Sequence, residues 1–147
     1  MTRPAAREMA MRLSFFAAEP FRNAGEAISA FFEREYYSTL KHEDGLFSNY
    51  PNKKQLDYII RLAEGVASRR SELDSIIEKY SIDRKVSRIS KTAAAVLRCC
   101  IFEIKNMEDV PAAAAINEAV ELSKKYDDPE TSAFINGILG SFVREEI

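Results

Sequence analysis

A run of twelve residues, 93–104, is apolar at every position except Arg98 and Glu103. A helix that is apolar on most of its faces belongs at the centre of a helical bundle. Cys99 and Cys100 are neighbours in this run, and that geometry suits neither a mutual disulfide nor metal chelation. We therefore expect two buried thiols of a reducing compartment here, with no metal site and no cofactor.

The rest of the chain also has a helical period. Apolar residues recur at spacings of three and four in two further segments: Ile28, Phe31, Phe32 and Tyr36, and Leu56, Ile59, Ile60, Ala63 and Val66. No segment alternates long enough to predict a strand. Prolines separate the periodic runs, and Asp128 with Pro129 is typical of a helix cap followed by a first-turn proline. The predicted helices are 4–18, 24–40, 52–70, 71–80, 88–105, 111–126 and 129–145.

These features predict an all-α fold, one compact domain over residues 1–147 with about seven helices. The chain has 147 residues, enough for a sizeable core, and 46% of them are hydrophobic. No apolar run approaches the roughly 20 residues that cross a bilayer, and the N-terminus has no secretion signal. We expect a cytoplasmic protein that does not contact a membrane.

Catalysis has little support in this sequence. The single histidine, His42, lies in the segment 41–52, which we interpret as a loop. Glu118 and Glu121 lie three apart, as carboxylates on a solvated helix face commonly do. Because no strand precedes a glycine-rich loop and no His, Cys and carboxylate cluster has metal spacing, we expect no enzyme.

The charges are distributed unevenly, although the net charge is only −2. Residues 1–22 carry four arginines against two glutamates, and residues 53–91 carry ten basic against six acidic side chains. Residues 92–147 carry five basic against ten acidic side chains. This pattern is compatible with one anionic and one basic partner, and equally with an ordinary solvated surface.

Two asparagines stand among apolar neighbours near the C-terminus. A buried Asn amide needs partners for two donors and an acceptor, which packing alone does not require. We predict that Asn117 and Asn136 are buried structural clamps that join one helix to its neighbours.

The same region resembles the C-terminal half of the NusB family of bacterial transcription antitermination factors. The resemblance is carried by Pro111, by 115–122 (Ala-Ile-Asn-Glu-Ala-Val-Glu-Leu) with Lys124, and by 134–139 (Phe-Ile-Asn-Gly-Ile-Leu). The segment 96–104 and the opening Ala-Arg-Glu-Met-Ala of 6–10 are also similar, whereas 23–90 match only in helical pattern and length. The resemblance implies a NusB-like helical bundle.

The resemblance also implies RNA binding. NusB-like proteins hold a single-stranded boxA element with an arginine-rich arm, the first helix and the start of the last helix. By position these elements correspond to Arg3, Arg7, Phe15, Glu130, Thr131, Ala133 and Phe134. Here the arm has two arginines instead of a run, and Phe15 occupies a tyrosine-type position. Each lost phosphate contact would lower RNA affinity.

The implied protein partner is NusE, a ribosomal protein of the small subunit. The matching surface lies on the predicted helices 71–80 and 88–105. It contains Arg98 and Glu103, which are too far apart by one residue for a good intrahelical ion pair. The implied function is antitermination in ribosomal RNA operons as part of the RNA polymerase antitermination complex. Some relatives form homodimers that cover the RNA-binding face, and a homodimer stays open for this chain.

Two alternatives stay open beside this function. The chain could be a helical protein-interaction module that has lost RNA binding, which the short arginine arm permits. It could also be an RNA-binding domain related to the extensions of RNA cytosine methyltransferases. Salt-dependent binding to a boxA-like strand separates antitermination from the interaction module.

Overall fold

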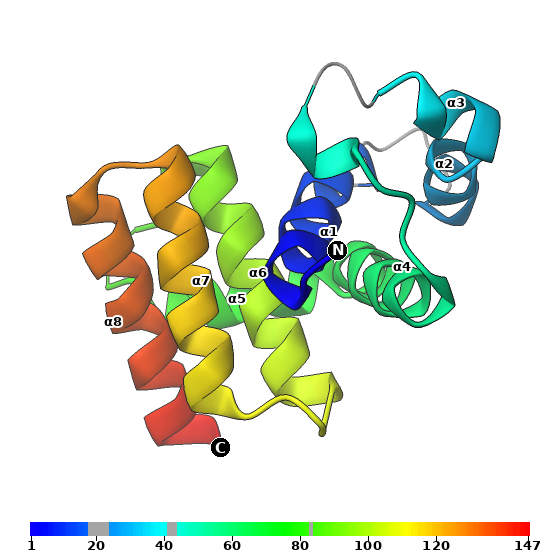
Figure 1. Cartoon of the computed structure of the whole chain (residues 1–147). Helices are drawn as coiled ribbons and strands as arrows, with labels where there is room; N and C mark the ends of the chain where they lie inside the picture. The colour runs from blue at the N-terminus through cyan, green and yellow to red at the C-terminus, as the bar shows by residue number, and fades with distance from the viewer. Residues whose placement is uncertain (18–23, 41–43, 83) are drawn as a thin grey trace. The chain divides into compact units, whose positions relative to one another are not determined.

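The computed structural model describes residues 1–17, 24–40, 44–82 and 84–147 (Figure 1). These ranges contain eight α-helices, two short 3₁₀ helices and no strand, which confirms the all-α prediction. The chain divides into two compact units, Met1–Ser68 and Arg69–Ile147, and each is described by itself. The prediction of a single domain stays a prediction. Within the described ranges, no helix combines the length and the apolar character that a membrane crossing requires.

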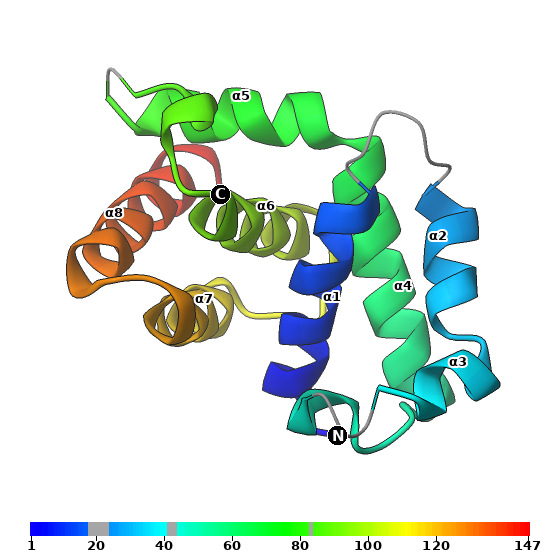
Figure 2. The ribbon, with the colours of Figure 1, turned by 90° about the horizontal axis from the view of Figure 1, so that it is seen from above.

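The first unit is built around a pair of long helices. It comprises α1 (Arg3–Ala17), α2 (Ala24–Phe31), α3 (Arg34–Ser38), the 3₁₀ helix η1 (Gly45–Phe47) and α4 (Lys53–Ser68). Helix α1 lies along α4, and α2 contacts both (Figure 2). The apolar stripe predicted for 56–66 supplies the buried face of α4, whose fully covered residues are Ile59, Leu62, Ala63 and Val66.

The predicted helix 24–40 is interrupted, and this part of the prediction is wrong. Helix α2 ends at Phe31, and Glu33 adopts an extended backbone conformation with φ −62° and ψ 125°. The Glu33 carboxylate accepts hydrogen bonds from the backbone N–H groups of Glu35 and Tyr36 at 3.0 and 2.9 Å. It therefore caps a new helix, α3. Because of this break, Tyr36 is 49% exposed and does not share the buried face of Phe32.

An aromatic cluster closes the end of the first unit after the break. The rings of Phe31, Phe32, Tyr37, Phe47 and Tyr50 lie in mutual edge-on or stacked contacts with centroids 5.0–6.3 Å apart. The Tyr37 hydroxyl donates to the Asn49 carbonyl at 2.9 Å, and the Tyr50 hydroxyl donates to the Phe32 carbonyl at 2.6 Å. Burial raises the pKa of Tyr37 to about 12.

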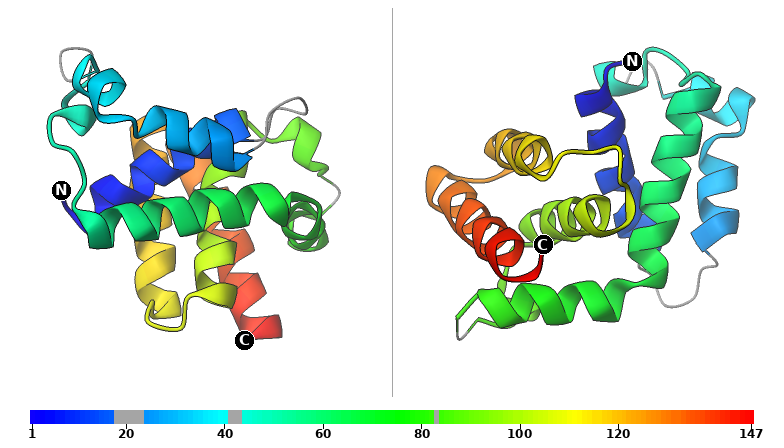
Figure 3. Two further views of the ribbon diagram at one scale, coloured as in Figure 1. Left: turned by 90° about the vertical axis from the view of Figure 1, so that its right-hand side faces the viewer. Right: turned by 90° about the horizontal axis from the view of Figure 1, so that it is seen from below.

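The second unit surrounds one buried helix. It comprises α5 (Arg70–Tyr80), the 3₁₀ helix η2 (Val86–Arg88), α6 (Lys91–Asn106), α7 (Ala112–Tyr126) and α8 (Pro129–Glu146). Helix α6 lies between α5, α7 and α8 and contacts all three (Figure 3). Every residue from 93 to 103 is buried. Cys99 and Cys100 are both buried in it. The central position predicted for 93–104 within its bundle is therefore confirmed.

Arg98 and Glu103, the two charged residues of the apolar run 93–104, are buried as well, whereas the resemblance implies that they belong to a partner-facing surface. The Arg98 guanidinium donates to Asp74 of α5, with Nε–Oδ1 2.6 Å and Nη2–Oδ2 3.3 Å. Glu103 is 1% exposed. Since α5, α7 and α8 enclose α6, an isolated charge in its sequence finds an internal partner. A Glu103→Lys change would therefore place a cation in the interior and would not leave the fold intact.

The pair between Arg98 and Asp74 should be a measurable source of stability. We expect Arg98→Ala to lower the free energy of unfolding by about 2–3 kcal/mol, because it leaves Asp74 without its two-point donor and removes buried side-chain volume. Chemical denaturation monitored by circular dichroism measures the loss.

Arg70→Ala is the matched control. Arg70 lies 3.8 Å from the same carboxylate, but its side chain is 42% exposed. Its removal should cost under about 1 kcal/mol. Equal losses for the two variants would contradict a special role for the pair in the interior.

Candidate nucleic-acid interface

In the first unit, the predicted RNA-binding arginine Arg3 lies beside the start of α4. Its guanidinium carbon is 4.1 Å from the centre of the Tyr58 ring. Together with Ala6, Asn52, Lys54 and Gln55, these two residues line a pocket of about 220 Å³. The position therefore combines cationic, aromatic and amide groups, which are the groups that hold single-stranded nucleic acids.

The local sequence explains how this pocket is held. Asn52 and Gln55 form a reciprocal capping box at the start of α4, with both side-chain-to-backbone bonds at 2.9 Å. The Gln55 amide also donates to the Met1 carbonyl. At the start of α1, the Thr2 hydroxyl accepts from the Ala5 N–H at 3.2 Å. Arg3 is thus fixed by the caps of two helices.

Three cations without a carboxylate partner lie at the beginnings of α1 and α4. Within the described part of the chain, Arg3, Lys53 and Lys54 are exposed and have no ion pair. Arg12 differs, because it pairs with Asp44 at 2.7 Å and approaches Glu8 at 3.8 Å. The positive potential of this surface therefore belongs to the beginnings of α1 and α4.

Two further predicted residues, Arg7 and Phe15, also belong to α1. Arg7 is half-buried one turn after Arg3. Phe15 lies in α1, but its side chain is outside the described part of the structure. His42 also lies outside the described residues, and among the described ones no group of three or more His, Cys, Asp or Glu could hold a metal ion.

In the second unit, the predicted residues lie in the first two turns of α8. Asp128 caps the helix by accepting from the Thr131 N–H at 2.7 Å, and Pro129 occupies the first turn as expected. This backbone bond, followed by the Thr131 hydroxyl, lowers the pKa of Asp128. Its stabilisation is therefore present above the unfolded-state pKa and is lost as the pH falls through the lower folded-state value.

The four predicted residues of α8 do not share one face. Glu130 is exposed and Phe134, one turn later, is half-buried. The Arg84 guanidinium carbon lies 4.6 Å from the centre of the Phe134 ring. Ala133 instead lines a groove between α7 and α8, and Thr131 is half-buried beside the cap. Glu130 and Phe134 are the pair that could read a base together, because they are four residues apart on one side of a helix.

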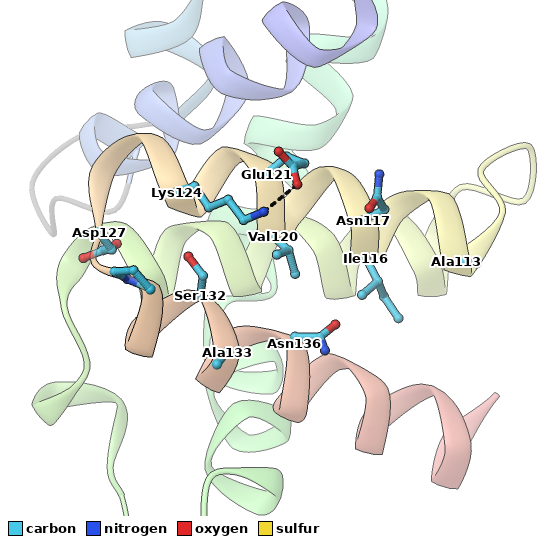
Figure 4. A pocket seen from close by; sticks show the side chains of 11 residues that line it. Ala113, Ile116, Asn117, Val120, Glu121, Lys124, Asp127, Ser132, Ala133 and Asn136 are labelled. Atoms are coloured by element: carbon cyan, nitrogen blue, oxygen red, sulfur yellow. Dashed lines mark hydrogen bonds and ion pairs between the residues drawn. The ribbon is translucent and has the colours of Figure 1, made fainter.

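The groove between α7 and α8 has a volume of about 730 Å³, and apolar side chains form much of its wall (Figure 4). Ile116 and Val120 point into it from α7. Asn117 and Asn136 border it and are both exposed, so the prediction that they are buried clamps is wrong. The amides of Asn117 and Asn136 border the open side of the α7–α8 pair. Burying them would require a third helix over the groove.

The polar contact that does join α7 to α8 was missed by sequence reasoning. The hydroxyls of Ser123 and Ser132 lie 2.7 Å apart and are buried, and Ser123 also donates to the Val120 carbonyl at 2.7 Å. The available signal is the spacing of Ala115, Ala119 and Ser123, the buried residues of α7. Small residues four apart let two helix backbones approach closely.

Comparisons with known proteins agree with this architecture. The family model described as the NusB family matches residues 5–144. The chain belongs to the NusB family. The transcription antitermination protein NusB of Acetivibrio thermocellus is 38% identical over 147 residues, which span the whole of this chain and 92% of that protein. The same protein of Clostridium botulinum (strain Kyoto, type A2) is 34% identical over 97% of this chain and its own full length.

Solved NusB structures share the fold. A crystal structure of the antitermination factors NusB and NusE in complex with double-stranded RNA covers 97% of this chain and 96% of the matched chain, with a TM-score of 0.73 and 23% identity. The solution structure of NusB from Aquifex aeolicus covers 99% of this chain and 94% of its own, with a TM-score of 0.67 and 22% identity. These likenesses confirm the predicted NusB-like helical fold.

Replacing an exposed asparagine and replacing a buried serine should affect the free energy of unfolding to different extents. We expect Asn117→Leu to change the free energy of unfolding by less than about 0.5 kcal/mol, as is usual for surface positions. Ser123→Ala should lower it by about 1–2 kcal/mol, because the Ser132 hydroxyl loses its partner. Thermal and chemical denaturation of both variants measures the difference. A larger loss for Asn117→Leu than for Ser123→Ala would contradict this assignment.

Proposed function

We propose that this protein is a transcription antitermination factor that binds boxA-type single-stranded RNA together with the ribosomal protein NusE. Its place is in the RNA polymerase antitermination complex on ribosomal RNA operons. The observation that carries the proposal is the 38% identity, over the whole chain, to a protein named for transcription antitermination. The solved complex of NusB and NusE with double-stranded RNA supports NusE and RNA as the two kinds of partner. The relatives' name favours this function over an interaction module or a methyltransferase extension.

The RNA-binding role is assigned to side chains of both units. Arg3 and Arg7 of α1 neutralise phosphate, and Phe15 adds apolar or stacking surface. On α8, Phe134 offers a ring for a base, and Glu130 is an exposed acceptor beside it. The resemblance also assigns Thr131 and Ala133, which belong to the same two turns of α8, to the RNA site. Phosphate contacts set the register, and contacts to base edges supply sequence preference.

The NusE-type partner is assigned to the outer surface of α5 and the ends of α6, because Arg98 and Glu103 themselves are covered within this chain. Arg98 acts there as a positioning residue for α5 through Asp74. Protein contact and RNA contact on one factor add a second tether to the elongation complex, which raises the effective concentration of each.

The decisive test is a titration of labelled boxA-type RNA with this protein, alone and with purified NusE, at 50 and 200 mM salt. Fluorescence anisotropy reports the affinity. We expect binding that weakens as salt rises, because counterions are released from phosphates, and tighter binding when NusE is present. Absence of binding at low salt in both arms would overturn the proposed function.

Single arginine replacements test the phosphate contacts. Arg3→Ala and Arg7→Ala should each weaken boxA-type and scrambled RNA about equally, because phosphates carry no base identity. Each should lower the slope of log affinity against log salt by about 0.7, the value for one contact on a single strand.

Arg34→Ala is the matched control for these variants. Arg34 is an exposed arginine of the first unit whose guanidinium carbon lies 4.1 Å from the Tyr50 ring, as Arg3 lies over Tyr58. Its loss should leave RNA affinity unchanged. The arginine assignment is contradicted if folded Arg3→Ala and Arg7→Ala proteins behave as Arg34→Ala does.

A further inference from the structure

Four basic residues lie close together in sequence in the connection from α5 to α6 and at the first position of α6. Arg84, Lys85, Arg88 and Lys91 lie within eight residues and are all exposed. Within the described part of the chain, none of the four has a carboxylate partner. Other cations of this unit differ, since the ammonium groups of Lys79, Lys105 and Lys124 each lie within 3.6 Å of a carboxylate oxygen.

This connection is held by contacts at three points: one with α8, one with α5 and one with the α7–α8 turn. Arg84 lies over the Phe134 ring at 4.6 Å. The Glu78 carboxylate accepts from the Val86 N–H at 2.9 Å. At the far end, the hydroxyls of Ser90 and Thr92 donate to Asp127 in the α7–α8 turn at 3.1 and 2.8 Å. The basic side chains are therefore carried by an anchored backbone.

The anchored backbone places like charges together. Lys85 is the N-cap of the single 3₁₀ turn η2 and Arg88 is its last residue, and the Arg88 N–H donates to the Lys85 carbonyl at 2.9 Å. Residues three apart in a 3₁₀ turn lie on the same side. Two cations held on one side repel each other, and an anion that contacts both relieves this repulsion.

We propose that Lys85, Arg88 and Lys91 bind phosphates of the RNA strand whose base is held at Phe134. This inference rests on the proposed function and extends its RNA site along the α5–α6 connection. Arg84 marks the junction, because a guanidinium stacked on an aromatic ring offers a second flat surface against which a base can lie.

The carboxylate of Glu130 favours RNA over an acidic protein segment as the ligand. Glu130 is exposed on the same side of α8 as Phe134. A carboxylate repels an acidic peptide, but it accepts a hydrogen bond from the amino group of a base such as cytosine. Cations for the backbone and an acceptor for a base edge together fit a single-stranded nucleotide segment.

The test compares two triple variants of the full chain by RNA titration. Lys85→Gln, Arg88→Gln and Lys91→Gln together remove three positive charges from the connection. Lys79→Gln, Lys105→Gln and Arg144→Gln remove the same charge near Glu146, where Lys79 lies 3.6 Å from that carboxylate at the other end of α8. Labelled boxA-type RNA is titrated with wild type and both variants between 50 and 200 mM salt, and denaturation checks that each is folded.

We expect the connection variant to lose about 2 from the salt slope, or 0.7 for each of three contacts, and the control variant to keep the wild-type slope. Between 50 and 200 mM salt, wild type would then lose roughly 20-fold more affinity than the connection variant. If wild type binds and both variants keep its slope, the inference is overturned while the proposed function stands.

Two other outcomes also decide the matter. Equal loss in both triple variants would overturn the inference, because it would reflect net charge alone. Unchanged RNA binding by the connection variant, with weakened binding of NusE, would overturn it in favour of a protein ligand. If wild type itself fails to bind RNA, the proposed function fails first.

Discussion

Burial of α6 on nearly all of its surface is the constraint on which the second unit depends. Eleven consecutive residues, 93–103, are buried, and α5, α7 and α8 all contact this helix. Burying a run of aliphatic side chains supplies much of the free energy that offsets chain entropy. Because Arg98 is buried together with this helix, its charged side chain needs an internal partner, and Asp74 is that partner. The ion pair is thus a consequence of the apolar helix, and it fixes α5 against it.

Two adjacent aspartates, Asp127 and Asp128, connect the buried helix α6 to the candidate RNA surface on α8. Asp127 accepts from Ser90 and Thr92, so the turn before α8 is tied to the start of α6. Asp128 caps α8 itself. One short turn therefore connects the buried helix to the first turns of α8, where Glu130 and Phe134 are exposed or half-buried. Functional side chains held by a rigid scaffold lose less entropy on binding.

Much of the fold could be predicted because its signals are local. The helical period, the apolar run at 93–104 and the cap at Asp128 each act within one or two turns, and the structure agrees with all three. The break at Glu33 was missed because no glycine or proline marks it, and the capping carboxylate is not a preferred N-cap type. Asn117, Asn136 and Glu103 were misplaced for a different reason. Whether a polar side chain of a helix is covered depends on the neighbouring helices. The spacing of apolar residues within one helix does not show where those neighbours lie.

The bond from Gln55 to the Met1 carbonyl has a thermodynamic consequence for ligand binding. Because this bond and the Thr2 cap hold Arg3 in the first turn of α1, the side chain is presented by ordered backbone rather than by a loose tail. A disordered arm that folds on its ligand shows a large unfavourable entropy and a large negative heat-capacity change. Arg3 should contribute little to either quantity. Preorganisation of an arginine can therefore offset, in RNA affinity, the smaller number of arginines in this arm.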